Sequence, residues 1–151
     1  MVFLSAEINL LLLTNLTMTR FRKSNNLFLT AITTEPAICN SGGSEPQPDF
    51  QQGLRAICDN LGIAFIIAEV ITGFRVHLDG ARACSRVTPE LAIFAEAIAS
   101  GSALSVFTGQ YKRMQPVAVG RVNYAGTTNA GNPSIATALA TRKINGKRKS
   151  S

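Results

Sequence analysis

The sequence lacks several residue types on which common catalytic and metal sites depend. Of its 151 residues none is tryptophan, and only one, His77, is histidine. A single histidine argues against histidine-based catalytic triads and against histidine-rich metal sites. The 3 cysteines, Cys39, Cys58 and Cys84, are odd in number and show no CxxC spacing. They therefore predict reduced thiols in an intracellular protein and no metal site.

The chain also lacks an apolar stretch of the roughly 20 residues that a membrane-spanning helix needs. Within residues 1–27 the uninterrupted apolar run is Leu10–Leu13, and polar residues flank it on both sides. Positive charge follows this run, whereas a secretory signal has it before the run. We therefore expect no membrane partner and a cytoplasmic location. Arg20, Arg22 and Lys23, with serine and threonine nearby, leave organelle targeting open.

Acidic residues are scarce, and the excess positive charge lies at the ends of the chain. The formal net charge is +6. Residues 1–27 and 142–151 together contain 8 basic residues and 1 acidic residue, whereas residues 28–141 contain 7 basic and 8 acidic residues. A basic terminal segment is more often a solvated end than a nucleic-acid-binding surface. We therefore expect no nucleic-acid partner and treat residues 146–151 as a basic tail.

What the chain does contain is a strand–helix–strand pattern in its first half. Residues 27–34 are rich in β-forming side chains and predict a strand. Residues 49–61 predict a helix, with Asp49 as N-cap, Gly62 after its end, and apolar residues at helical spacing, namely Phe50, Leu54, Ile57 and Leu61. The apolar run at 63–68 is typical of a strand buried on both faces of a parallel sheet. The pattern favours an α/β fold.

Five blocks of distinctive sequence follow one another through the chain, at separations that make a chance match improbable. In chain order they are Glu35-Pro36 with Asn40-Ser41-Gly42, then Gly53-Leu54-Arg55-Ala56-Ile57-Cys58-Asp59-Asn60-Leu61-Gly62, then Ala68-Glu69-Val70-Ile71-Thr72-Gly73-Phe74-Arg75, then Thr88-Pro89-Glu90-Leu91 with Ala92–Gly101, and finally Gly126-Thr127 with Gly131-Asn132-Pro133.

These blocks resemble the class III aminotransferases, pyridoxal-phosphate enzymes that include glutamate-1-semialdehyde aminomutase, and they resemble that branch most. The family's versions are a Glu-Pro strand end with an Asn-Ser-Gly loop, GLRxICDxxG, DEVITGFR, PDL with GKAIAxGxP, and GTxxGNP. The resemblance covers residues 28–145 and leaves residues 1–27 unassigned. It implies an α/β fold, a partial three-layer sandwich equivalent to the second half of a fold-type I large domain.

The resemblance also implies that two positions on which the chemistry depends are substituted. Pyridoxal phosphate needs a lysine that forms an imine with its aldehyde and a carboxylate that keeps its pyridine nitrogen protonated. Ala68 stands at the position of that aspartate, and Glu96 stands at the position of the Schiff-base lysine. Glu69 cannot replace the missing aspartate, because adjacent side chains of a strand point to opposite faces.

Three further positions match cofactor-contacting residues of the family. By resemblance Val70 packs on one face of the ring, Asn40 lies near the ring oxygen, and Thr127 reaches the phosphate across a dimer interface. Each residue has a plainer structural interpretation, Val70 as core, Asn40 in an Asx-turn and Thr127 in a turn. The cofactor implied is pyridoxal 5'-phosphate, and the two substitutions predict that its binding is weak or absent.

The function implied by the resemblance is amino-group transfer on 2-amino or 2-oxo acids, but the substitutions predict a chain that is inactive by itself. The alternatives are a non-catalytic protein that docks on a full-length relative, and a remnant without function. A partial sheet leaves apolar area uncovered, which also predicts homo-oligomers. Helices at 49–61 and 133–144 are expected to cover part of the sheet, and residues 1–27 are expected to have no place in it.

Overall fold

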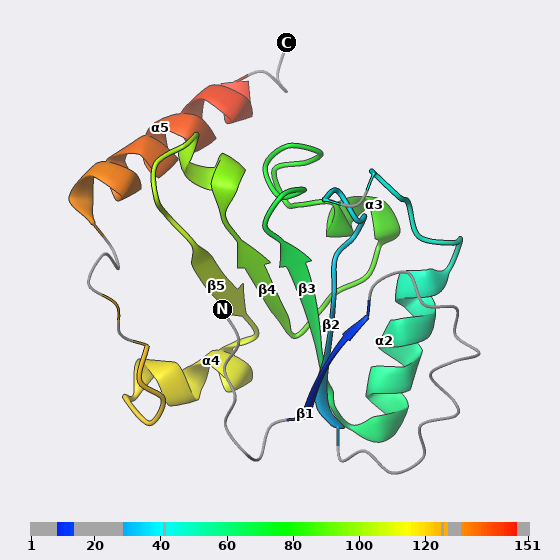
Figure 1. The fold of residues 1–151 in the computed structure, drawn as a ribbon. Helices are drawn as coiled ribbons and strands as arrows, with labels where there is room; N and C mark the ends of the chain where they lie inside the picture. Colours follow the sequence, from blue (N-terminus) through cyan, green and yellow to red (C-terminus); the bar gives the residue numbers. More distant parts are fainter. Residues whose placement is uncertain (1–8, 14–28, 41, 125, 127–130, 148–151) are drawn as a thin grey trace.

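The computed structural model describes residues 9–13, 29–40, 42–124, 126 and 131–147. Its centre is a five-stranded sheet whose strands lie side by side in sequence order (Figure 1). The first four strands are parallel and the last is antiparallel to its neighbour, which confirms the expected α/β fold. The strands are β1 (Asn9–Leu13), β2 (Leu29–Thr34), β3 (Ala64–Glu69), β4 (Leu91–Phe94) and β5 (Val106–Gly109).

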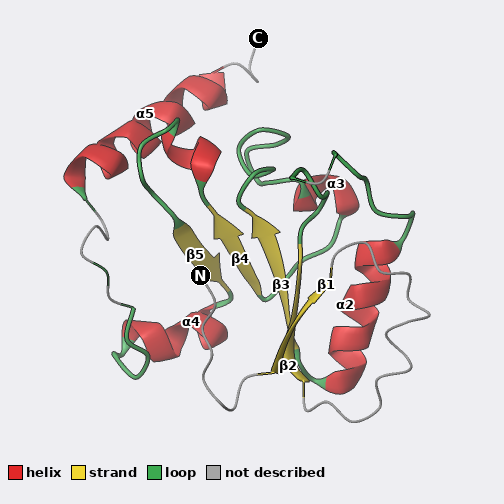
Figure 2. Cartoon of the chain, in the orientation of Figure 1, coloured by secondary structure: helices red, strands yellow, loops and turns green. Residues whose placement is uncertain are grey.

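The helices lie at different places around this sheet. Figure 2 shows α2 (Phe50–Leu61) alongside β2 and β3, whereas α5 (Asn132–Lys147) lies past the edge of the sheet at which β5 begins. The shorter elements are α3 (Arg82–Ser85), the 3-10 helix η1 (Glu96–Ala99) and α4 (Tyr111–Ala118). Among the described residues, no helix combines the length and the apolar character that crossing a membrane requires.

Helix α2 packs on β2 and β3 through an apolar stripe that differs in part from the predicted one. Phe50 and Leu54 are buried as expected, in one core with Ile32, Phe65 and Ile67. The stripe then continues through Cys58, which is 0% exposed, while Leu61 at the helix end is 56% exposed. The steps of three and four residues keep all of these side chains on one helix face, and Leu61 is exposed on that face because it is the last residue of the helix.

The two ends of α2 show why one predicted cap forms and the other does not. Gly62 has a φ of 66°, and its N–H donates to the carbonyl oxygen of Asp59, as expected for a left-handed residue that ends a helix. Asp49 does precede the helix, but its own φ is 61° and its side chain makes no capping hydrogen bond. An N-cap residue needs an extended backbone to aim its carboxylate at the first turn. The predicted side-chain cap is therefore wrong.

Strand β3 is buried on one face and only half-buried on the other. Phe65, Ile67 and Glu69 are 0% exposed, whereas Ile66 and Ala68 on the opposite face are partly accessible. The expectation of burial on both faces is therefore wrong for the second face. The reason is the place of α5, which packs chiefly against η1 rather than over β3.

The N-terminal segment contributes an edge strand to the sheet. Residues Asn9–Leu13 form β1, which pairs in parallel with β2 and shows a register irregularity after Asn9. The expectation that residues 1–27 have no place in the sheet is therefore wrong for these five residues. The free edge of β2 offers unpaired backbone groups, which a short apolar segment can satisfy. The division of the chain at residue 27 stays a prediction.

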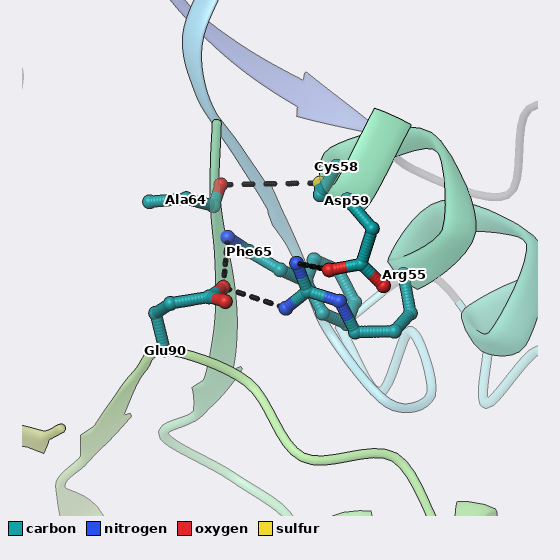
Figure 3. Close-up of polar contacts among 6 residues, drawn as sticks. All are labelled: Arg55, Cys58, Asp59, Ala64, Phe65 and Glu90. Atoms are coloured by element: carbon teal, nitrogen blue, oxygen red, sulfur yellow. Dashed lines mark hydrogen bonds and ion pairs between the residues drawn. The ribbon is translucent and has the colours of Figure 1, made fainter. Parts of the chain in front are cut away.

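An ion-pair network ties α2 to the amino end of β3 (Figure 3). Arg55 donates to the Glu90 carboxylate at 2.6 Å and to the Asp59 carboxylate at 2.8 Å. The same Glu90 oxygen accepts the backbone N–H of Phe65 at 2.7 Å. Burial alone would raise the pKa of Glu90, but the hydrogen bonds from Arg55 and Phe65 outweigh it and lower the pKa below its usual range. These residues of the family-like blocks thus have a structural role.

The three cysteines are free, as the sequence predicts. Cys58 is a residue of α2 on its buried face, and its thiol lies 4.0 Å from the carbonyl oxygen of Ala64 (Figure 3). Burial raises the pKa of the Cys58 thiol to about 11, so the thiol stays protonated at neutral pH. Cys39 and Cys84 are exposed. Cys58 is therefore a core residue and has no nucleophilic character.

Candidate functional site

A small pocket of about 190 Å³ opens where the carboxyl ends of β2, β3 and β4 meet. Parallel strands bring their carboxyl ends to one edge of a sheet, which is where open α/β sheets bind ligands. The pocket contains four of the five positions that the sequence singles out. Its lining is Glu35, Asn40, Ala68, Val70, Ile71, Thr72 and Glu96.

Four of the predicted residues lie near one another in the pocket, but their proximity does not establish their roles. Ala68, in β3, and Val70, directly after it, come from one strand end, while Asn40 belongs to the loop after β2. Val70 is half-buried and lines the pocket, and Asn40 is exposed at its rim. Thr127 lies outside the described residues. The roles of all five residues as cofactor contacts stay predictions.

The side chain of Glu69 points to the face of β3 opposite to that of Ala68, as expected. It is 0% exposed and does not line the pocket that Ala68 lines. Its carboxylate accepts the Thr72 hydroxyl at 2.7 Å and the backbone N–H groups of Ala81 and Arg82 at 2.8 and 2.9 Å. Glu69 therefore holds the loop between β3 and α3 in place, and this loop supplies Val70 and Thr72 to the pocket.

A glycine makes this arrangement possible. Gly80 has a φ of 84°, and a Cβ at its position would overlap the carboxylate of Glu69. Only glycine both adopts this backbone conformation readily and leaves room for the acid. The sequence contains no obvious signal for this contact, because Gly80 lies eleven residues after Glu69 and outside the recognised blocks.

Glu96 begins the 3-10 helix η1 and reaches the pocket from the end of β4. Its φ is 37°, in the left-handed region that residues other than glycine rarely adopt. The carboxylate lies 3.5 Å from the guanidinium of Arg75, and both side chains are about half exposed. Sequence reasoning missed this pair, because nothing in the spacing of the two residues predicts that their loops meet.

The charged groups of the pocket lining are carboxylates. Glu35, the first residue of the Glu-Pro block, lines the pocket together with Glu96, and neither lysine nor arginine does so. Lys112 is exposed on α4, as expected for a solvated lysine. Sequence reasoning quoted Glu35 within its block but gave it no role. The pocket thus offers hydrogen-bond acceptors and negative charge, and its lining contains no amine that could form an imine.

Comparison with known proteins decides the family. The pattern of the family described as "Aminotransferase class-III" matches residues 6–146. The chain belongs to the class III aminotransferase family. It is 40% identical, over 114 residues, to glutamate-1-semialdehyde 2,1-aminomutase of Desulfatibacillum aliphaticivorans, a match that covers 75% of this chain and 27% of that relative. The enzyme of the same name from Desulfovibrio desulfuricans is 40% identical over 117 residues, 77% of this chain and 28% of the relative.

Solved structures of the family agree with the fold. Ornithine aminotransferase from Plasmodium yoelii superimposes with a TM-score of 0.80 at 19% identity, over 94% of this chain and 38% of that one. A transaminase from the marine bacterium Virgibacillus gives a TM-score of 0.72 at 25% identity, over 80% of this chain and 28% of that one. The structure is therefore consistent with the expected partial large domain of fold type I. The chain spans little more than a quarter of the length of the curated relatives it matches.

Proposed function

We propose that this class III aminotransferase-like chain does not by itself catalyse amino-group transfer on 2-amino or 2-oxo acids. The observation that carries the proposal is the lining of one pocket by both Ala68 and Glu96. The family resemblance assigns these positions to the pyridinium aspartate and the Schiff-base lysine. A methyl group cannot hold a proton on a pyridine nitrogen, and a carboxylate cannot form an imine with an aldehyde. Both chemical groups are therefore missing at the place where they would act.

Pyridoxal phosphate, the cofactor on which the family depends, fits this pocket poorly. The carboxylates of Glu35 and Glu96 would repel its phosphate. The volume of about 190 Å³ is also below the roughly 300 Å³ at which small-molecule pockets usually begin. We infer that the chain binds the cofactor weakly or not at all. The free cysteines support an intracellular, cytoplasmic setting for the protein.

Borohydride reduction tests the first half of this proposal. The protein is mixed with pyridoxal phosphate, reduced and digested, and the phosphopyridoxyl groups are located by mass spectrometry. We expect scattered, substoichiometric labelling of exposed lysines such as Lys112, whose Lys112→Arg variant should lose one labelled peptide and nothing else. Stoichiometric labelling of one specific lysine would overturn the proposal, because it would reveal an internal imine that the pocket geometry does not provide.

A repair variant tests whether the two substitutions alone explain the expected failure to form an imine with pyridoxal phosphate. Ala68→Asp with Glu96→Lys restores the missing carboxylate and amine, and the measurement is the absorbance band of an imine with pyridoxal phosphate. We expect no band, because Glu35 still lines the pocket and the new ammonium would face the guanidinium of Arg75. A band in the double variant, absent from each single variant, would show that the rest of the site is intact.

A second candidate function is that of a non-catalytic interaction protein. Large apolar side chains are exposed on α4 and just after it, with Tyr111 at 79%, Val119 at 58% and Val122 at 51%. Isolated exposed apolar residues are ordinary, but a group of them supports an association surface. The partner would be a full-length class III relative or a second copy of this chain. The third possibility, a remnant without function, predicts neither association.

Sedimentation velocity separates these cases. The chain is run at two concentrations, alone and with a glutamate-1-semialdehyde aminomutase. Val119→Ser with Val122→Ser should abolish any complex, while Leu61→Ser serves as the matched control because Leu61 is comparably exposed, at 56%, at the end of α2. A monomer under every condition would contradict the interaction function.

A further inference from the structure

A second cavity, of about 860 Å³, lies between β5 and α5, and we propose that it binds an amphipathic carboxylate. Its volume is within the roughly 300–1,000 Å³ of small-molecule sites. It shares no lining residue with the pocket that contains Ala68 and Glu96. Most of its lining is apolar, and the residues on which the inference rests are Phe74, Val106, Phe107, Ile135, Leu139 and Arg142.

Hydrogen bonds and one aromatic contact hold the walls of this cavity in place. The hydroxyl groups of Ser100 and Thr141 lie 2.9 Å apart, and Ser102 donates to Thr137 at 3.2 Å, so α5 is fastened to the segment that follows η1. The ring of Phe74 meets that of Phe94 edge to face, with centroids 5.8 Å apart. The cavity is therefore formed before any ligand arrives, which lowers the ordering cost of binding.

One face of α5 gives the cavity its chemical character. Ile135, Leu139 and Arg142 are spaced at i, i+4 and i+7, so they line up along one side of the helix. Ile135 is 38% exposed and Leu139 is 62% exposed, which leaves apolar area for a ligand to cover. Arg142 follows them at the C-terminal end of the row. The face thus presents an apolar surface that ends in a guanidinium.

Arg142 is available to an anion. Its guanidinium makes no hydrogen bond or ion pair with any other residue in the described part of the chain. Residues 142–147 of α5 contain three basic residues and no acidic residue, which makes this end of the helix positive. A guanidinium binds a carboxylate through two parallel hydrogen bonds. The matching ligand has an aliphatic or aromatic body along Leu139 and a carboxylate on Arg142.

Titration with octanoate tests the inference, with 1-octanol as the matched uncharged probe. Calorimetry should show saturable binding of octanoate at one site. Arg142→Gln should weaken octanoate about tenfold and change 1-octanol less than twofold, and Arg142→Lys should fall between, because it keeps the charge and loses the paired geometry. Leu139→Ser should weaken both probes about tenfold. Leu61→Ser, at a leucine of comparable exposure on α2, should change neither.

Three results would overturn the proposal. The first is octanoate binding that does not saturate. The second is octanoate binding that Arg142→Gln leaves unchanged, since the guanidinium would then not be the anchor. The third is an absence of octanoate binding together with concentration-dependent assembly that Leu139→Ser abolishes. The cavity would then be part of an interface between copies of the chain. Circular dichroism of each variant shows that it is folded. None of these results depends on whether the other pocket forms an imine.

Discussion

The two ends of strand β3 differ in how their charged groups are held. At the amino end Arg55 and Glu90 lie 2.6 Å apart with side chains only 17% and 15% exposed. At the carboxyl end Arg75 and Glu96 lie 3.5 Å apart with side chains 54% and 53% exposed. The first pair joins a helix to two strands, whereas the second joins the loop after β3 to the first residue of η1. The charged groups are therefore held more tightly where they stabilise the fold than beside the pocket at the carboxyl ends of the strands.

The same contrast appears between two adjacent residues. Ala68 and Glu69 end β3 on opposite faces, and only Ala68 lines the pocket. Glu69 keeps three hydrogen bonds that organise the following loop. The proposed replacement of an aspartate by Ala68 concerns a side chain that lines the pocket, whereas loss of Glu69 would leave buried donors without partners. The proposed change at the site is thus compatible with an intact fold.

Glu69→Ala should give the largest effect. It tests whether Glu69, at the carboxyl end of β3, stabilises the fold. We expect the free energy of unfolding to fall by about 3–5 kcal/mol, because a hydroxyl and two backbone N–H groups lose a buried charged acceptor. Urea unfolding followed by circular dichroism measures it. Glu69→Gln keeps one acceptor oxygen and should cost roughly half as much. A loss below about 1 kcal/mol for the alanine variant would contradict the anchoring role.

Glu90→Ala should give the next largest effect, at the amino end. The expected loss is about 2–4 kcal/mol, because Arg55 and the N–H of Phe65 both lose their shared acceptor in a partly buried site. Asp59→Ala, which removes the 64% exposed partner of the same arginine, should cost less than about 1 kcal/mol. Equal losses in the two variants would mean that burial does not distinguish the two contacts.

The lowered pKa of Glu90 sets the sign of a pH effect. Its carboxylate is favoured in the folded protein, so its contribution to stability is fully present above the unfolded pKa and is lost as the pH falls through the lower folded pKa. The difference in unfolding free energy between the wild type and Glu90→Gln should therefore be largest near neutral pH and shrink on acidification below about pH 4. A difference that grows on acidification would show that the sign is wrong.

Arg75→Ala should give the smallest effect. It tests whether the exposed ion pair at the carboxyl end of β3 contributes less stability than the pair at the amino end. The half-exposed pair with Glu96 should contribute no more than about 0.5 kcal/mol to the free energy of unfolding, and less in high salt. The measurement is urea unfolding at low and high ionic strength. A loss comparable to that of Glu90→Ala would remove the distinction between the two ends of β3.

Local sequence determined the main elements and the family of this protein. Apolar runs predict β2 and β3, and helical spacing with Gly62 predicts α2, because these signals depend on neighbours a few residues apart. The ordered blocks identify the class III aminotransferases, which the comparisons confirm. They also select Asn40, Ala68, Val70 and Glu96, four residues that the fold brings to one pocket. Parallel strands make such a meeting predictable, since their carboxyl ends share one edge.

Only the tertiary structure decided which distant groups meet. The anchoring of the loop after β3 by Glu69 could not be inferred from local sequence, because Glu69 meets Ala81 and Arg82 only after the chain has turned back. The same holds for the edge strand β1 and for the cavity that Arg142 helps to line. Contacts of this kind depend on the path of the whole chain and on which faces other elements leave open. Local patterns contain no information about either, and for that reason the burial of β3 was predicted on two faces and is found on one.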